Sequence, residues 1–264
     1  MSVKIKILDL NLCGGKESRM NIIYEDKKII VVNKPAGQLV QSGKSFELDL
    51  TSEVINYRKN RGESCYAAVI NRLDRPVSGI VLFAKDRAAA ADLSSQMQAQ
   101  GFCKQYHAVV CGKLPQKTGE FVDYLQKDAR AGVSRVVKKN DSGAKPAKLF
   151  YEAVKEIVVR VENAVSDKNE YFTEYDKTDK SDKAEEQIYT IVKIRLITGR
   201  HHQIRVQFAS RGLPLLGDMK YGSPALCGAS VPGIELKKNE IALCASSLTA
   251  AGHEFSVRPE WLKE

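Results

Sequence analysis

The sequence predicts an α+β protein with a large mixed, mostly antiparallel sheet and flanking helices and loops. Patterns typical of strands outnumber those typical of helices along the 264 residues. The helical patterns are spaced irregularly, which argues against a regular βαβ series. The chain contains 43% apolar residues, enough for a substantial core.

In the N-terminal part, turn residues separate short apolar runs. Lys28–Val32 predicts a strand, followed by a turn at Lys34–Gly37 and a return strand. Residues 51–62 predict a short helix that ends at Gly62. The apolar run Ile80–Ala84 is typical of a strand buried on both faces.

The next segments alternate between helix and strand. Asp86 is placed to cap a helix with a C-terminal stop at Gly101. Residues 104–114 predict a strand, with Gly112 at the start of the turn. Further patterns predict strands over 148–161 and 187–199, a short amphipathic helix over 200–212, and two final strands around Gly252.

Charge is distributed unevenly along the chain. The net charge is +9, but Glu162–Gln187 contains nine acidic residues and four lysines, a net of −5. The remaining residues therefore carry 9 − (−5) = +14. We expect a single domain over residues 1–264, with 162–187 as a mobile acidic hairpin insertion. The basic remainder favours a polyanionic partner such as nucleic acid, with a soluble basic protein as the alternative.

Several classes of protein are disfavoured. No run approaches the roughly 18 apolar residues that span a bilayer, and the N-terminus does not read as an export signal. The six cysteines show no CxxC pair, and without an export signal we expect reduced thiols in a cytoplasmic protein. We also expect a monomer. The spacing of Cys103, His107, His201 and His202 does not favour a metal site, since adjacent histidines would point to different sides of a helix. The segment after Gly37 lacks phosphate-loop spacing.

Asp74 has the most informative position of the acidic residues. It lies between Arg72 and Arg75, directly before the buried strand pattern, so we expect it at the edge of the sheet and partly withdrawn from water. A nearby cation would keep such a carboxylate ionised as a nucleophile or base. The alternative is a turn acid whose charge the adjacent arginines balance. In a second segment, Arg200 and Arg205 lie on a predicted helix whose N-terminus favours anions.

Four motifs in order resemble the RluA-type RNA pseudouridine synthases. "IIVVNKPAGQLV" is similar to that family's N-K-P-x-G motif, and "NRLDRPVSGIVLFAK" to H-R-L-D-x-x-T-S-G-x-x-L-x-A-K. "KQYHAVVCG" is similar to K-x-Y-x-A-x-V-x-G. "LITGRHHQIRVQFASRGLPLLGDMKYG" resembles L-x-T-G-R-x-H-Q-I-R-V-H…G-x-P-x-x-G-D-x-x-Y-G. The resemblance implies the catalytic fold of that family over most of the chain.

The resemblance also implies roles for individual residues. Asp74 matches the catalytic aspartate, Tyr106 the tyrosine that packs against the target uracil, and Arg205 the arginine paired with the aspartate. Arg72 matches a residue that fills the gap left by a flipped nucleotide in some relatives. We expect Arg72, Arg75, Lys104 and Arg200 to contact RNA.

The implied reaction is the isomerisation of uridine to pseudouridine in rRNA or tRNA. It imports no group and oxidises nothing, so no cofactor or metal is expected. Asp74 could attack the sugar, attack the uracil, or remove a ribose proton to give a glycal. Two alternatives are a catalytically silent RNA-binding protein on the same fold and a hydrolase that releases free uracil.

The sequence departs from the family pattern at four positions: Asn71, Val77, His201 and Gln207. We expect these residues to tune RNA contacts or helix capping. The small N-terminal RNA-binding domain of many relatives is not recognisable, which leaves RNA binding to the basic catalytic domain and favours a compact target such as a tRNA stem-loop. The acidic segment 162–187 would repel phosphates, so we expect it away from the RNA face.

Overall fold

The computed structural model describes residues 20–42, 48–99, 101–161, 185–222, 228 and 230–263. The helices are α1 Leu50–Asn60, α2 Arg87–Gln98 and α3 Gln203–Ala209. The strands are β1 Asn21–Glu25, β2 Ile29–Lys34, β3 Ala68–Val69, β4 Ser78–Ala84, β5 Cys103–Cys111, β6 Thr118–Asp128, β7 Val133–Val137, β8 Lys145–Val161, β9 Glu185–Leu196, β10 Leu243–Ala250 and β11 His253–Ser256.

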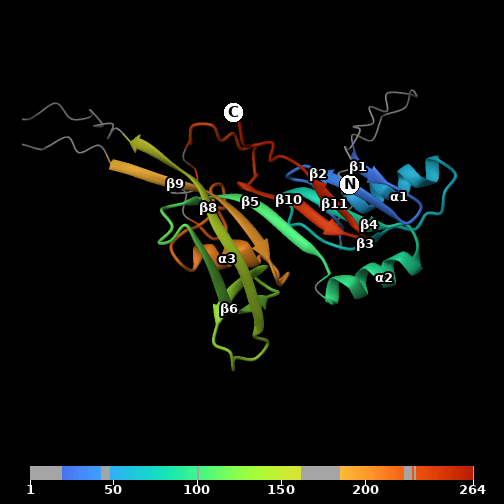
Figure 1. The fold of residues 1–264 in the computed structure, drawn as a ribbon, viewed down its shortest axis with the longest axis horizontal. Helices are drawn as coiled ribbons and strands as arrows, with labels where there is room; N and C mark the ends of the chain where they lie inside the picture. Colours follow the sequence, from blue (N-terminus) through green and yellow to red (C-terminus); the bar gives the residue numbers. More distant parts are fainter. Residues whose placement is uncertain are drawn as a thin grey trace, which may run out of the picture.

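These strands form one 11-stranded sheet in the order β1-β2-β4-β10-β5-β9-β8-β6-β7, with β3 paired to β4 and β11 to β10 (Figure 1). The β4–β10 pair is parallel, and the other strand pairs of the described residues are antiparallel. The predicted fold class is therefore confirmed. In the described ranges, no helix is long and apolar enough to cross a membrane.

Most of the predicted elements occur where the patterns placed them. Asp86 accepts a hydrogen bond from the Ala89 amide and caps α2, and Gly101 donates to the Gln96 carbonyl at its end. All of β4 is buried, as expected for a strand covered on both faces. On β9, Lys193 and Arg195 are exposed, whereas the alternating apolar side chains are buried.

The predicted return strand after Gly37 is wrong. The chain instead continues as a loop whose Leu39 and Val40 carbonyls accept hydrogen bonds from the amides of Leu50 and Thr51, at the start of α1. Val40 is apolar because it packs into the core beside α1, not because it belongs to a strand. The antiparallel neighbours of β2 are β1 and β4.

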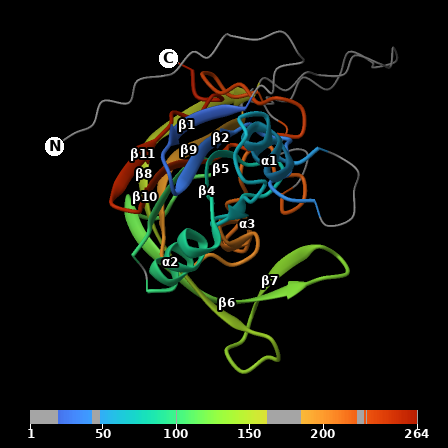
Figure 2. The ribbon, with the colours of Figure 1, turned by 90° about the vertical axis from the view of Figure 1, so that its right-hand side faces the viewer.

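Two further expectations were inaccurate or fall outside the described residues, and one hairpin was not predicted. The helix over 200–212 is shorter than expected and not amphipathic, because Gln203–Phe208 are all buried. The β6–β7 hairpin, which extends from the rest of the sheet in Figure 2, was not anticipated. Of the acidic segment, residues 162–184 lie outside the described residues, and Glu185–Gln187 belong to β9.

The two faces of the sheet are covered by different elements. On one face, Val54 of α1 and Phe208 of α3 join a core with inward side chains of β2, β4, β5, β8 and β9. On the opposite face, α2 packs through Leu93 against β2 and β4. The C-terminal segment covers the rest of that face, where Trp261 is almost completely buried.

Gly79 lies where the two halves of the sheet meet. It pairs with Ala245 in the parallel β4–β10 ladder. Its φ of +116° is in a region that L side chains rarely adopt, and an added Cβ would overlap the backbone of Ala245. A glycine is therefore required for β4 to approach β10 directly after the turn that carries Asp74.

Candidate active site

Asp74 lies in the loop between β3 and β4, on the face covered by α1 and α3. Leu73 and Val77 anchor this loop in the core, and the Val77 amide donates to the Asp74 carbonyl. The Asp74 side chain keeps 29% exposure. The backbone is thus fixed on both sides of a carboxylate that reaches solvent.

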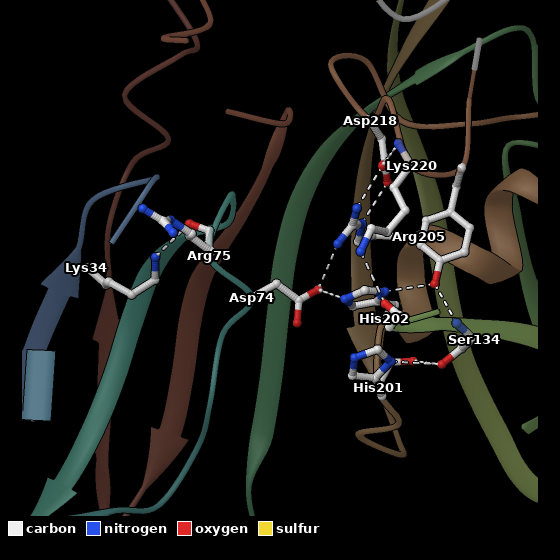
Figure 3. A network of polar contacts seen from close by, with 11 residues as sticks. Lys34, Asp74, Arg75, Ser134, His201, His202, Arg205, Asp218 and Lys220 are labelled. Carbon is white, nitrogen blue, oxygen red and sulfur yellow. Dashed lines mark hydrogen bonds and ion pairs between the residues drawn. The ribbon is translucent and has the colours of Figure 1, made fainter. Parts of the chain in front are cut away.

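The two oxygens of the Asp74 carboxylate are used differently. Arg205 Nη1 donates to Oδ2 at 3.2 Å, and His202 Nε2 lies 3.5 Å from the same atom. Among the described residues, Oδ1 has no hydrogen bond or ion pair. Figure 3 shows Asp74 pointing toward Arg205 and His202 with one oxygen engaged. The second oxygen is available to a bound substrate.

Arg205 is fixed by a second acid. Its Nε donates to Asp218 Oδ2 at 2.7 Å and its Nη2 to Oδ1 at 2.8 Å. Arg205 retains 6% and Asp218 1% side-chain exposure, so the bidentate pair is buried. Burial opposes the charge, but the hydrogen bonds to Asp218 outweigh it and raise the pKa of Arg205. Because Asp218 occupies two donors, Nη1 remains for Asp74.

His202 and Tyr221 complete the polar network beside Asp74. The Tyr221 hydroxyl lies 2.8 Å from His202 Nδ1 and accepts a hydrogen bond from the Ser134 amide at 2.7 Å. Burial and the charge of Arg205 outweigh the attraction of Asp74, and they lower the pKa of His202 to about 4. The contact to Asp74 at neutral pH is therefore between a neutral imidazole and a carboxylate.

The adjacent histidines do not point to different sides of a helix. They precede α3, and their rings stack with centroids 3.7 Å apart. His202 adopts the left-handed conformation, with φ of 53°, which turns its ring back over that of His201. The expectation from helical geometry was wrong because the helix begins one residue later.

Tyr106 lies on β5 with its side chain on the same face of the sheet. It is 7% exposed. Burial, together with the negative charge of Asp74, raises the pKa of its hydroxyl, so the ring is a neutral aromatic surface at physiological pH. The structure thus brings Asp74, Tyr106 and Arg205 to one site from a loop, a strand and a helix.

The Lys34 side chain is buried beside the Asp74 loop. Its Nζ donates to the carbonyls of Pro35, Gln38 and Arg75 at 2.8, 2.9 and 3.3 Å. Burial lowers its pKa to about 7, against the attraction of Asp74 and Glu240. These hydrogen bonds tie the turn after β2 to the loop that carries Asp74 (Figure 3).

The residues expected to contact RNA differ in their surroundings. Arg72 and Arg75 are exposed, and Arg75 Nε donates to the Gly37 carbonyl. Lys104 lies beside Gly199, two positions before Tyr106, and burial lowers its pKa. Arg200 Nε donates to the Pro146 carbonyl. Of the four, Arg75 and Arg200 also hold loops in place.

Two of the departures from the family pattern have internal partners. The buried Asn71 exchanges hydrogen bonds with the backbone of Ile80 and Leu82. Gln207, also buried, donates to Asp123. These two side chains stabilise the fold, so the expectation that they tune RNA contacts or helix capping was wrong for them.

Sequence reasoning assigned no role to Lys34, His202, Asp218 or Tyr221. All four lie within motifs that were recognised: Lys34 in "NKPAG", His202 in "TGRHHQIR", and Asp218 and Tyr221 in "GDMKYG". The motifs indicated that these positions matter, but the contacts depend on loops that are remote in the sequence.

The fold defines a class of protein. Two human structures, RNA Pseudouridylate Synthase Domain Containing 1 and Domain Containing 4, share this fold with TM-scores of 0.63 and 0.64. They are 18% and 19% identical in sequence, and the alignments cover 94% and 90% of this chain and 86% and 88% of theirs. The architecture is that of pseudouridine synthase domains.

The sequence comparison is more specific. The family described as RNA pseudouridylate synthase matches residues 28–210, and the chain belongs to this family. The tRNA pseudouridine synthase C of Yersinia pestis is 30% identical over 203 residues, 77% of this chain and 70% of the relative. The ribosomal large subunit pseudouridine synthase C of Escherichia coli K12 is 29% identical over 201 residues, 76% of this chain and 53% of the relative. The chain therefore spans little more than half the length of some curated relatives.

Proposed function

We propose that this protein is an RNA pseudouridine synthase that isomerises uridine in structured RNA, with Asp74 as its catalytic carboxylate. The observation that carries the proposal is the asymmetric use of the Asp74 oxygens. Arg205 and His202 contact Oδ2, which leaves Oδ1 to meet a nucleotide. Family membership supports the reaction class.

The net reaction exchanges one glycosidic bond for another. The C1′–N1 bond breaks, the uracil turns within the site, and a C1′–C5 bond forms. The proton on C5 is lost and N1 gains one, so the composition of the RNA does not change. Attack on the sugar, attack on the uracil and removal of a ribose proton all require an ionised carboxylate with an accessible oxygen, and Asp74 is suited to each.

The ring of Tyr106 suits a uracil base that has been flipped out of the RNA. A uridine within RNA structure must leave its stack before its glycosidic bond is accessible. The buried, uncharged ring of Tyr106 offers an aromatic surface for the extruded base. The exposed Arg72 belongs to the same loop as Asp74, and we assign its guanidinium to the space that the flipped base leaves.

Positive charge on neighbouring elements supports RNA as the substrate. The β6–β7 hairpin contacts α3. The hairpin and the connection that follows β7 present exposed basic side chains, namely Lys127, Arg130, Arg135, Lys138 and Lys139. Ser134, close to the turn of this hairpin, contacts His201, so this surface adjoins the site. Relatives named for tRNA and for the large ribosomal subunit leave both substrates open. We favour a compact tRNA stem-loop.

Mapping pseudouridine in total RNA tests this function. Cells lacking the gene are complemented with the wild-type chain or with Asp74→Asn. We expect a specific pseudouridine to disappear with the gene, to return with the wild type, and to remain absent with Asp74→Asn. The proposal fails if no uridine changes, or if the Asn variant restores the modification.

A further inference from the structure

The hydrogen bonds around His202 determine which of its ring nitrogens carries the proton. The Tyr221 hydroxyl oxygen accepts a hydrogen bond from the Ser134 amide. The hydroxyl hydrogen of Tyr221 therefore remains for His202 Nδ1, which lies 2.8 Å from the hydroxyl oxygen. A neutral imidazole has one donor and one acceptor nitrogen. If Nδ1 accepts from Tyr221, Nε2 is protonated.

The other side of the ring leads to the same assignment. His202 Nε2 faces Asp74 Oδ2 at 3.5 Å. A protonated Nε2 points an N–H at this carboxylate, whereas the opposite tautomer would point a lone pair at it. Two independent contacts therefore favour the same tautomer.

We propose that Tyr221 locks His202 in the Nε2–H tautomer, and that His202 is a positioning residue that holds Asp74 Oδ2 so that Oδ1 faces the substrate. This role rests on the proposed function, because it concerns the carboxylate assigned there. His202 would act together with Arg205, whose Nη1 contacts the same oxygen.

The charge states of the two partners agree with this assignment. Burial, with the repulsion of Arg205, lowers the pKa of His202 to about 4, so the ring is neutral at pH 7. Burial raises the pKa of Tyr221, so its hydroxyl keeps the hydrogen that Nδ1 accepts. The Arg205 guanidinium lies over the Tyr221 ring at 5.1 Å and helps to fix the orientation of the phenol.

The neighbouring His201 provides an internal control, since its contacts predict the opposite tautomer. Ser134 Oγ donates to the His201 carbonyl at 2.8 Å and lies 3.0 Å from His201 Nδ1. Because the hydroxyl hydrogen is used by the carbonyl, Nδ1 of His201 must donate. Two stacked imidazoles are thus expected to carry their protons on different nitrogens.

Nitrogen-15 NMR of the ring nitrogens in the full-length protein at neutral pH tests the lock directly. We expect a protonated Nε2 for His202 and a protonated Nδ1 for His201. Tyr221→Phe should give a tautomer mixture at His202 and leave His201 unchanged. Ser134→Ala removes the hydroxyl that contacts His201, so His201 should become a mixture of tautomers. The variant keeps the backbone amide that binds Tyr221, so the tautomer of His202 should not change. A wild-type His202 protonated at Nδ1, or a Tyr221→Phe variant with an unchanged tautomer, overturns the lock.

Measurements of kcat and KM on the substrate RNA test the positioning role of His202. His202→Gln supplies an N–H at about the position of Nε2, whereas His202→Met has a similar length and no donor, and both meet the same left-handed backbone. We expect kcat to fall roughly tenfold in His202→Met, with KM for RNA unchanged and partial rescue in His202→Gln. Equal kcat values for the wild type and His202→Met overturn the role.

The NMR and kinetic experiments separate this inference from the proposed function. The NMR assignment does not depend on activity. If the wild-type chain forms no pseudouridine in any RNA, the proposed function fails and the positioning role fails with it, while the spectra still decide the tautomer. If the wild type is active and the Met variant matches it, the positioning role alone is wrong.

Discussion

Asp218 controls how Arg205 meets the candidate catalytic carboxylate. It occupies Nε and Nη2 of the guanidinium, so Asp74 receives a single donor. With Asp218 absent, Arg205 would be free to rotate and cover both Asp74 oxygens. A residue that never contacts the substrate would thus determine whether the reactive oxygen stays exposed.

Asp218→Asn is expected to impair both stability and catalysis. Breaking one side of a buried ion pair costs about 3–5 kcal/mol, and the released Arg205 would block Asp74. The free energy of unfolding is measured by denaturant titration, and kcat on the substrate RNA. Asp123→Asn is the matched control, since Asp123 pairs with the partly exposed Arg211; we expect its kcat to stay within about twofold of wild type. A wild-type kcat in Asp218→Asn contradicts the account.

The depressed pKa of His202 predicts a pH dependence of stability. The pKa is about 4 in the folded protein and 6.5 for an unperturbed histidine. Between these values the unfolded chain binds the additional proton, so the free energy of unfolding falls as pH decreases from 6.5 to 4. Denaturant titrations at about pH 7, 5.5 and 4.5 should show a smaller decrease for His202→Gln than for wild type. Parallel curves would show that His202 does not titrate in this range.

At the residue scale, sequence reasoning identified the residues with chemical motifs but not their supports. Asp74 and Arg205 were paired by resemblance to a family, and the structure places them in contact. Lys34 and Asp218 were missed because burial and partner choice arise from loops that meet only in the folded chain. A lysine beside a proline, read alone, gives no sign that three carbonyls surround it.

At the scale of elements, the parallel β4–β10 pair places the Asp74 loop against the half of the sheet that carries Tyr106. Gly79 makes this approach possible. Gly79→Ala is expected to destabilise the protein by more than about 2 kcal/mol, since it combines a strained φ with backbone overlap. Thermal unfolding and kcat are the measurements. The control is Gly62→Ala, where φ is also positive but an added Cβ meets open space. Equal destabilisation at both glycines would refute the close-approach argument.

The β6–β7 hairpin and the connection that follows β7 should contribute phosphate contacts. Replacing Arg130 and Lys139 with alanine is expected to weaken RNA binding and to reduce the dependence of log K on log salt by about 0.7–0.9 for each phosphate that the variant no longer neutralises. Lys28 and Arg87, which are exposed on elements toward the opposite face, supply the control double variant. RNA-binding titrations of both double variants over a range of salt concentrations measure this slope. An unchanged slope in the hairpin variant would exclude it from the RNA interface.

Periodicity revealed the strands with clear alternation or a continuous apolar run, such as β4 and β9. It missed β6 and β7 because their exposed positions carry charged and apolar side chains alike, including Val122 and Val136. It also predicted a return strand around Val40, since an apolar residue buried in a loop has the same local pattern as a short strand. The structure of β6, β7 and the loop around Val40 depends on tertiary contacts, which a local sequence pattern does not show.

At the scale of the whole molecule, the basic charge and the polar network around Asp74 both support the proposed modification of RNA. The chain carries a net charge of +9, and its candidate active site contains the Asp74 carboxyl group, the guanidinium of Arg205 held by Asp218, and the buried ring of Tyr106. The expectations of a single domain and of an acidic segment away from the RNA remain predictions, as does the monomeric state.

The most direct measurement follows the proton at C5 of uridine. The purified full chain is incubated with its substrate RNA carrying tritium at that position. We predict that tritium release equals the pseudouridine formed, that no free uracil appears, and that Asp74→Asn releases none. Free uracil that retains tritium would indicate a glycosidic hydrolase. RNA binding without tritium release would indicate a silent binding protein, and either result would contradict the proposed isomerisation.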